Sequence, residues 1–329
     1  MSGLTESYLL ELRAFLERLS LGEKIVSIFL AIFIILGNGL VLIATWRERS
    51  LHQPNKYFIA CLAVADLLVG LFLAPLKVYL LDFNIEALFS IPYYLCRFMM
   101  WIDTFALVSS VYTLTFISCD RYLKISKPLQ YKSRMTTSRS LKVIFVIVLI
   151  SITLATYSAT PDSGADGILT KLFYLCLLII GILLPTTIIL IMYALVFRVA
   201  HERNKMLANG ELDQTINQRT ALRRDMKVIR MLLVVIGVFI FCWGPLFTWT
   251  WLLIYHPNLI IINSDSLSRA YRMLLFKSIV FTLPFVNSLC NPIIYACLDQ
   301  TYREAFKRLF QRMMCQRDQR RQQPPIELR

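Results

Sequence analysis

Seven long apolar stretches restrict this 329-residue chain to few folds. Each stretch can cross about 30 Å of hydrocarbon as an α-helix that rises about 1.5 Å per residue. Only 17% of the residues are charged, against about 25% in soluble domains. We therefore predict an all-α membrane protein, a seven-transmembrane helix bundle with a short amphipathic eighth helix. The expected spans are residues 25–46, 57–81, 94–119, 141–160, 172–198, 228–254 and 272–298.

Basic residues gather on one side of the expected membrane. The formal net charge is +14, and Lys and Arg crowd the loops after the first, third and fifth spans and the tail after the seventh. Loops rich in Lys and Arg stay in the cytoplasm, so the N-terminus is expected outside, as in a multi-pass protein of the plasma membrane. This asymmetry explains the charge without nucleic acid, and we expect no nucleic-acid partner.

Both ends of the chain carry amphipathic patterns. Residues 1–24 lack the basic start of a signal peptide and predict an extracellular N-terminus with an interfacial helix. Residues 299–315 alternate apolar and basic positions at helical spacing, which predicts a helix on the inner leaflet. Cys315 at its end is a palmitoylation candidate. Residues 316–329 are charged and are expected to form a disordered cytoplasmic tail.

Polar groups inside the spans are few, and each is costly in a bilayer. The third span closes with Asp120-Arg121-Tyr122, a carboxylate beside a guanidinium. Prolines at 185, 245 and 292 each break a helical hydrogen bond and predict a kink or hinge. A transporter would also place carboxylates in the membrane. However, we find no internal repeat, and a transporter does not explain the motifs of spans three, six and seven together.

These motifs make the chain resemble a rhodopsin-like (class A) G-protein-coupled receptor over residues 22–315. The resemblance implies that 25–298 is a receptor domain without enzyme activity. It also implies contact with membrane lipid and coupling to a heterotrimeric G protein, with arrestin as a further partner. The residues that carry it are Gly37-Asn38-Gly39, Asp66, Asp120-Arg121-Tyr122, Cys242-Trp243-Gly244-Pro245 and Asn291-Pro292-Ile293-Ile294-Tyr295.

The resemblance also implies a switching mechanism. At rest, Arg121 pairs with Asp120 and with Asp225 at the base of span six. Activation swings span six outward about Pro245 and frees Arg121 for the G protein. The switch residues are then Asp120, Arg121, Tyr122, Tyr193, Asp225 and Tyr295, and the packed relay behind them is Val111, Pro185 and Phe239.

One cluster of oxygen-bearing side chains resembles the sodium site of this family, where the ion acts as an allosteric ligand that stabilises the inactive state. A hard cation prefers oxygen ligands, and a carboxylate in apolar surroundings needs a positive partner. A hydrogen-bonded polar knot around a protonated Asp66 is the alternative. The cluster comprises Asp66, Ser110, Asn287, Ser288 and Asn291.

Asp103 is the main indication of the ligand. It lies 18 residues before Arg121, so it is about 27 Å further out on nearly the same helix face. A carboxylate there needs a cation. Asp103 matches the amine-anchoring position of the biogenic-amine receptor branch, which implies a small cationic amine as the ligand. The expected ligand-binding residues are Asp103, Thr104, Leu107, Trp243, Phe247, Thr250, Phe281 and Phe285.

Departures from that branch leave alternatives open. Phe285 stands where amine receptors usually have a tyrosine, and Leu177, Leu178 and Gly181 stand where catecholamine receptors present hydroxyls, so a catechol is not expected. Asp103 could instead pair with Lys77 inside the protein. A non-amine ligand, or high activity without ligand, is the alternative function. Cys96 lacks the loop cysteine with which the family usually bridges it.

Overall fold

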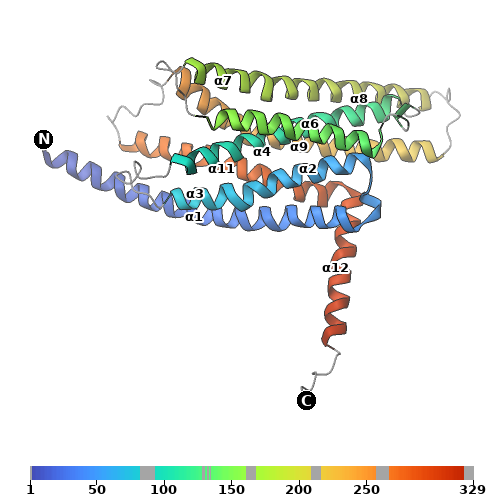
Figure 1. Ribbon diagram of the computed structural model, residues 1–329, viewed down its shortest axis with the longest axis horizontal. Coiled ribbons are helices and arrows are strands. Elements are labelled where there is room, and N and C mark those ends of the chain that lie inside the picture. Colours follow the sequence, from blue (N-terminus) through green and yellow to red (C-terminus); the bar gives the residue numbers. More distant parts are fainter. Residues whose placement is uncertain are drawn as a thin grey trace.

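The computed structural model describes residues 2–81, 93–127, 130, 131, 133, 135–160, 168–208, 216–256 and 267–321. All regular structure in these ranges is helical, and seven helical stretches are long and apolar enough to cross a membrane. Figure 1 shows them packed lengthwise in one bundle, so the predicted seven-helix fold is confirmed. The spans are Leu10–Arg47, Pro54–Leu80, Tyr93–Ser126, Thr137–Ser158, Lys171–Val199, Ile229–Tyr255 and Leu267–Leu298.

Two spans contain a wider, π-helical turn, labelled η2 and η4. Each wide turn ends two residues before a proline, Pro75 or Pro185. A proline lacks the N–H of the helical ladder and its ring clashes with the carbonyl four residues earlier, so the preceding turn widens. The second span is α2 (Pro54–Leu68), η2 (Val69–Leu73) and α3 (Ala74–Leu80), and the fifth is α7 (Ile168–Leu178), η4 (Ile179–Leu183) and α8 (Leu184–Ala208).

The other spans are single helices, and α1 is longer than expected. It runs without a break from Ser2 to Arg47, so residues up to 24 extend the first span instead of forming a separate helix. Phe15 stacks on Tyr271 with ring centroids 4.1 Å apart, which holds this extension against the seventh span. The remaining elements are η1 (Arg49–Leu51), α4 (Tyr93–Ser126), α6 (Thr137–Ser158), α9 (Ile216–Tyr255), α11 (Leu267–Leu298) and α12 (Gln300–Arg321).

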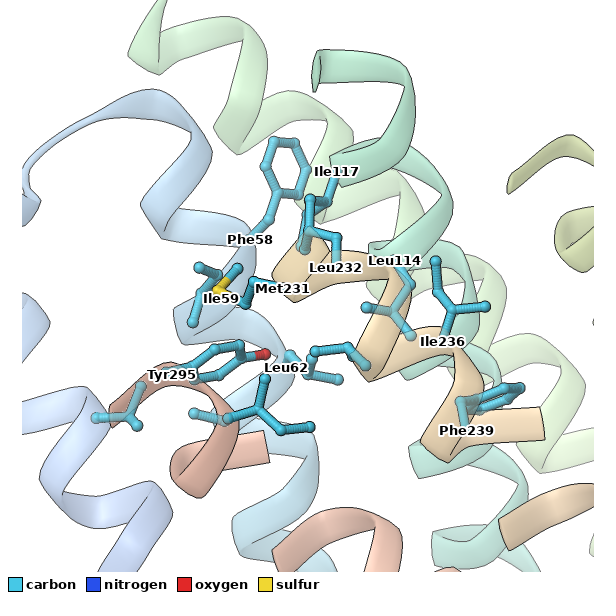
Figure 2. Close-up of a cluster of buried hydrophobic side chains, with 14 of the residues drawn as sticks. Phe58, Ile59, Leu62, Leu114, Ile117, Met231, Leu232, Ile236, Phe239 and Tyr295 are labelled. Atoms are coloured by element: carbon cyan, nitrogen blue, oxygen red, sulfur yellow. The ribbon is translucent and has the colours of Figure 1, made fainter. Parts of the chain in front are cut away.

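An apolar layer closes the cytoplasmic half of the bundle. Its side chains come from α2, α4, α9 and α11 and meet between the helices in Figure 2. Each is at most 4% exposed, so side chains of α9 pack in one core with those of α2, α4 and α11 at this level. The structure is therefore closed at the cytoplasmic end. The layer comprises Phe58, Ile59, Leu62, Leu114, Ile117, Met231, Leu232, Ile236 and Tyr295.

Polar contacts tie the outer end of α4 to α6. Arg97 donates from Nη1 to the carbonyl of Thr160 at 2.9 Å, and Trp101 donates from Nε1 to Thr156 Oγ1 at 3.2 Å. Cys96 is a free thiol, as is Cys176 on α7. In this structure, side-chain hydrogen bonds thus join these helix ends in the absence of a disulfide.

The helix after the seventh span is amphipathic, as predicted. Tyr302, Ala305 and Leu309 are buried against the bundle, whereas Phe310 is 61% exposed. In Figure 1, α12 leaves the end of the bundle across the direction of the spans, as a helix on a membrane surface would. It continues to Arg321, beyond the expected end at 315. The side chain of Cys315 and residues 322–329 lie outside the described residues.

Candidate functional site

A cavity of about 110 Å³ opens between α4, α7 and α9 in the outer half of the bundle. Asp103 of α4 lines it, together with the next residue, Thr104. Leu107, one helical turn further into the bundle, lines it as well. Trp243, Phe247 and Thr250 succeed one another along α9 at spacings that share one helix face. The complete lining is Met100, Asp103, Thr104, Leu107, Tyr174, Leu177, Leu178, Trp243, Leu246, Phe247, Thr250, Trp251, Ile254 and Tyr255.

The carboxylate of Asp103 makes no hydrogen bond or ion pair within the described part of the chain. Lys77, the internal partner considered above, is engaged elsewhere: its Nζ lies 3.8 Å from Glu23 Oε2 and donates to Thr282 Oγ1 at 3.0 Å. The Lys77 ammonium also lies 5.2 Å from the centre of the Phe285 ring. Glu23 and Thr282 thus satisfy Lys77, and Asp103 faces the cavity.

The two phenylalanines expected from α11 do not line this cavity. Phe281 is 40% exposed. Phe285 is buried in a separate cluster, where it packs with Ile34, Leu73 and Ala106. They follow the face of α11 that turns toward α1 and α3. Conversely, the aromatic residues Tyr174, Trp251 and Tyr255 line the cavity but were missed, because apolar residues surround every outer helix end and periodicity alone does not select the inward ones.

Aromatic rings form a continuous stack beneath the cavity. The centroid of Trp243 lies 5.8 Å from that of Phe247 and 6.2 Å from that of Phe239. Phe239, Val111 and Pro185, the three residues proposed for the relay, are all buried. The structure thus places a packed path between the cavity and the apolar layer.

The residues expected at the sodium site are all buried. Asn291 donates from Nδ2 to Asp66 Oδ2 at 2.8 Å, which joins α2 and α11 in the bundle centre. Asp66 is 1% exposed and forms no ion pair with a basic side chain among the described residues. Ser110, Asn287 and Ser288 are each at most 4% exposed. The cluster thus buries a carboxylate together with hydroxyl and amide groups, and hard cations prefer such oxygen ligands.

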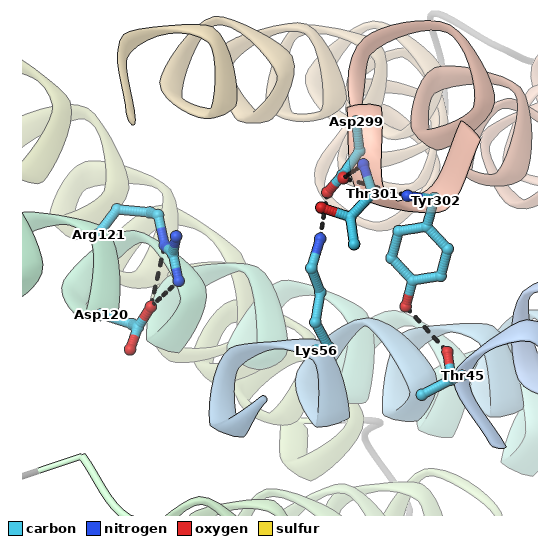
Figure 3. Close-up of polar contacts among 7 residues, drawn as sticks. All are labelled: Thr45, Lys56, Asp120, Arg121, Asp299, Thr301 and Tyr302. Atoms are coloured by element: carbon cyan, nitrogen blue, oxygen red, sulfur yellow. Dashed lines mark hydrogen bonds and ion pairs between the residues drawn. The ribbon is translucent and has the colours of Figure 1, made fainter. Parts of the chain in front are cut away.

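The charged pair at the end of α4 is buried. Arg121 donates from Nε to Asp120 Oδ2 at 2.9 Å, and its Nη2 contacts the same oxygen (Figure 3). The hydroxyl of Tyr131 donates to Asp120 Oδ1 at 2.9 Å. Asp120 therefore holds Arg121 against its own helix. The side chain of Asp225, the other expected partner, lies outside the described residues.

The remaining switch residues lie in the same half of the bundle. Tyr193 is 5% exposed, and its hydroxyl accepts a hydrogen bond from Ser118 at 3.3 Å. Tyr122 is half-buried, and Tyr295 lies in the apolar layer. Sequence reasoning missed a second buried ion pair, between Lys56 and Asp299, in the same half of the bundle (Figure 3). Its only sequence signal is an acidic residue directly before an amphipathic helix.

Comparisons with known proteins agree with this geometry. The chain is 28% identical to the alpha-1A adrenergic receptor of Mus musculus over 88% of its own length and 67% of the relative's. It is 27% identical to the adenosine receptor A2b of Rattus norvegicus, over 88% of this chain and 90% of that receptor. It is 28% identical to the histamine H2 receptor of Canis lupus familiaris, over 87% and 79%.

The family model described as 7 transmembrane receptor (rhodopsin family) matches residues 37–295. That range begins at the glycine before Asn38 and ends at Tyr295, so it includes the membrane cavity, the central polar cluster and the charged pair. The family consists of receptors and not of enzymes, and its members sit in the plasma membrane with the N-terminus outside. This chain belongs to the rhodopsin family of seven-transmembrane receptors, the class A G-protein-coupled receptors.

Proposed function

We propose that this receptor is activated by a small organic ammonium ion that binds Asp103. The observation that carries the proposal is a cavity-lining carboxylate without a partner among the described residues, while Lys77 is engaged by Glu23 and Thr282. A carboxylate in apolar surroundings needs a cation, and the ligand would supply it. Relatives named as adrenergic and histamine receptors support the amine class.

The cavity favours a compact ligand. A void of about 150 Å³ holds a benzene-sized ring in other proteins, and this cavity measures about 110 Å³. Aromatic faces of Trp243, Phe247 and Trp251 line it, and such faces attract cations. The wall at Leu177 and Leu178 offers no hydroxyl to a catechol. We therefore infer a small monoamine without a catechol group.

Ligand binding would act on the cytoplasmic end through the aromatic stack. Movement of Trp243 displaces Phe239, which packs in the same core as the apolar layer. In the proposed mechanism, α9 then moves outward about Pro245, Arg121 leaves Asp120, and a heterotrimeric G protein binds in the opening.

A sodium ion held by Asp66 and its neighbours would favour the closed state. Arrestin binding to the same opening and palmitoylation of Cys315 belong to this proposal as well.

A neutral ligand is the second candidate. The relative named adenosine receptor A2b is as similar to the chain as the adrenergic and histamine receptors are. Leu107, Leu177 and Leu246 make much of the cavity wall apolar. Activation by such a ligand would not depend on the charge of Asp103. High activity without any ligand would not depend on that charge either.

The test is G-protein activation in cells that express the receptor, measured against biogenic and trace amines and against nucleosides. Asp103→Asn is compared with wild type at matched surface level, and Ser109→Ala is the control. Ser109 lies on the same helix and donates only to Ala106 O of its own helix. We expect the substitution at Asp103 to raise the half-maximal amine concentration at least about 100-fold, because an unpaired buried charge costs about 3–5 kcal/mol. Amine responses that are equal in wild type and Asp103→Asn would refute the proposal.

A further inference from the structure

A buried ion pair joins three helices at the cytoplasmic end of the bundle. Lys56 near the start of α2 contacts Asp299, the residue between α11 and α12, through its ammonium group (Figure 3). The two residues are 6% and 4% exposed. A pair this well shielded from water is costly to form, and apolar residues of similar volume are often as stable or more stable. Stability alone therefore does not account for it.

Asp299 has a second role in the same place. Its Oδ1 accepts hydrogen bonds from the backbone N–H of Thr301 at 2.9 Å and of Tyr302 at 3.3 Å. This is the N-cap of α12, which an acidic side chain stabilises through the helix dipole. One carboxylate thus sets the turn from α11 into α12 with one oxygen and binds α2 with the other.

The pair also holds Tyr302. The Lys56 ammonium lies 4.7 Å from the centre of the Tyr302 ring. The Thr45 hydroxyl donates to Val41 O at 2.8 Å, so the Tyr302 hydroxyl is the donor in its 2.9 Å contact with Thr45 (Figure 3). Burial raises the pKa of Tyr302, which keeps this proton in place. Tyr302 is therefore held by α1 through its hydroxyl and by Lys56 of α2 through its ring.

Tyr302 connects this cluster to the apolar layer. Its ring stacks on Tyr295 with centroids 5.7 Å apart. Tyr295 is 1% exposed and belongs to the layer in which side chains of α9 share one core with those of α2 and α4 (Figure 2). A fixed Tyr302 thus keeps Tyr295 in the position that the closed layer requires.

We propose that Lys56 and Asp299 are positioning residues of the receptor switch, which hold Tyr295 in the closed layer and suppress signalling without ligand. This inference rests on the proposed opening of α9 toward a G protein, but not on the identity of the ligand. The pair acts at a distance from the cavity. Its loss should therefore change activity in the absence of ligand.

The test uses Lys56→Met/Asp299→Asn, expressed as the full chain. Removing both charges leaves neither one buried alone, and asparagine caps a helix about as well as aspartate. Ligand-free activation is measured with sensors for each class of G-protein α subunit at matched surface level. We expect a rise of at least three-fold over wild type. Lys56→Arg keeps the charge and should give the wild-type value.

Arg308→Gln is the matched control. Arg308 also belongs to α12, and its side chain is 54% exposed. The carboxylate of Glu48, which it contacts, keeps a second partner in Arg312 at 2.9 Å. It should leave ligand-free activity unchanged. Lys56→Gln, a milder variant that can still donate to Asp299, serves if the double variant reaches the surface poorly, and it should raise activity in the same direction.

Hydrogen–deuterium exchange of the purified receptor gives a readout that needs no G protein. Exchange over 229–239 of α9 should accelerate in the double variant.

Ligand-free activity and exchange at wild-type levels in the variants that fold would overturn the proposal. Silence to every amine together with a raised ligand-free signal would refute the proposed ligand and support the pair's role. Amine responses in wild type, with a ligand-free signal that the double variant leaves unchanged, would support the proposed ligand and refute the role of the pair.

Discussion

At the scale of single residues, one glycine sets how closely the first and seventh spans approach. A Cβ atom on Gly37 would lie 3.0 Å from Cγ and 3.1 Å from Cβ of Pro292. Next to it, Asn38 donates from Nδ2 to the carbonyl of Ser288 at 3.1 Å, a bond that requires this close approach. Small residues allow membrane helices to pack closely in this way.

We expect Gly37→Ala to destabilise the receptor by about 1–3 kcal/mol, because the rigid ring of Pro292 cannot give way and the helices must separate. Gly39→Ala is the control: nothing lies within 4 Å of its added Cβ, so alanine should be neutral or slightly stabilising in the helix. Thermal unfolding of the purified receptors in detergent measures both. Equal melting temperatures for the two variants would contradict the close approach.

At the scale of elements, the outer ends of α4 and α6 depend on hydrogen bonds. Arg97 reaches Thr160, and its guanidinium also lies 4.8 Å from the centre of the Tyr93 ring. Trp101 reaches Thr156 and stacks on Phe105. Because these contacts are partly exposed to solvent, each contributes only modestly to the stability of the receptor. The connection between the two helix ends therefore depends on several contacts together.

Arg97→Met/Trp101→Phe should therefore lower the melting temperature by a few degrees, since about two hydrogen bonds of roughly 1 kcal/mol each are lost. A reducing agent should leave wild type unchanged, because Cys96 and Cys176 are free thiols. Cys96→Ser is the matched control and should melt like wild type. A drop in wild-type stability on reduction, with a Cys96–Cys176 bridge seen by mass spectrometry, would contradict the structure.

At the scale of the whole molecule, the cavity and the G-protein end are separated by the central polar cluster. Asp66 and Asn291 join α2 and α11 between the two ends. If Na⁺ binds there in the closed state, linkage requires that the ion and an activating ligand weaken each other's binding by the same factor. Such couplings are typically 5–150-fold.

We therefore expect increasing NaCl, at constant ionic strength, to weaken amine binding by about ten-fold in wild type. Asp66→Asn should abolish this dependence, because it removes the only carboxylate of the cluster. N-methyl-D-glucamine chloride in place of NaCl separates sodium from general ionic effects. An equal response to both salts would assign Asp66 to a neutral polar knot instead.

The sequence by itself determined the architecture and the places of the polar residues. Hydropathy is a local property, and a run of apolar residues long enough for the bilayer must form a helix to satisfy its backbone. The seven predicted spans, the amphipathic α12 and the order of the motifs were therefore accessible without coordinates. Asp103, Trp243 and Asp66 could likewise be selected, because polar and aromatic groups at those depths are few.

Only the tertiary structure decided which side chains meet. The rotation of each helix and the reach of a lysine side chain depend on packing against distant segments, which periodicity does not contain. Phe281 and Phe285 thus lie away from the cavity, and Lys77 binds Glu23 because α1 begins well before the expected start at residue 25 and so includes Glu23. Lys56 and Asp299 are separated by most of the chain, and they pair because α2 begins, and α11 turns into α12, at the same end of the bundle.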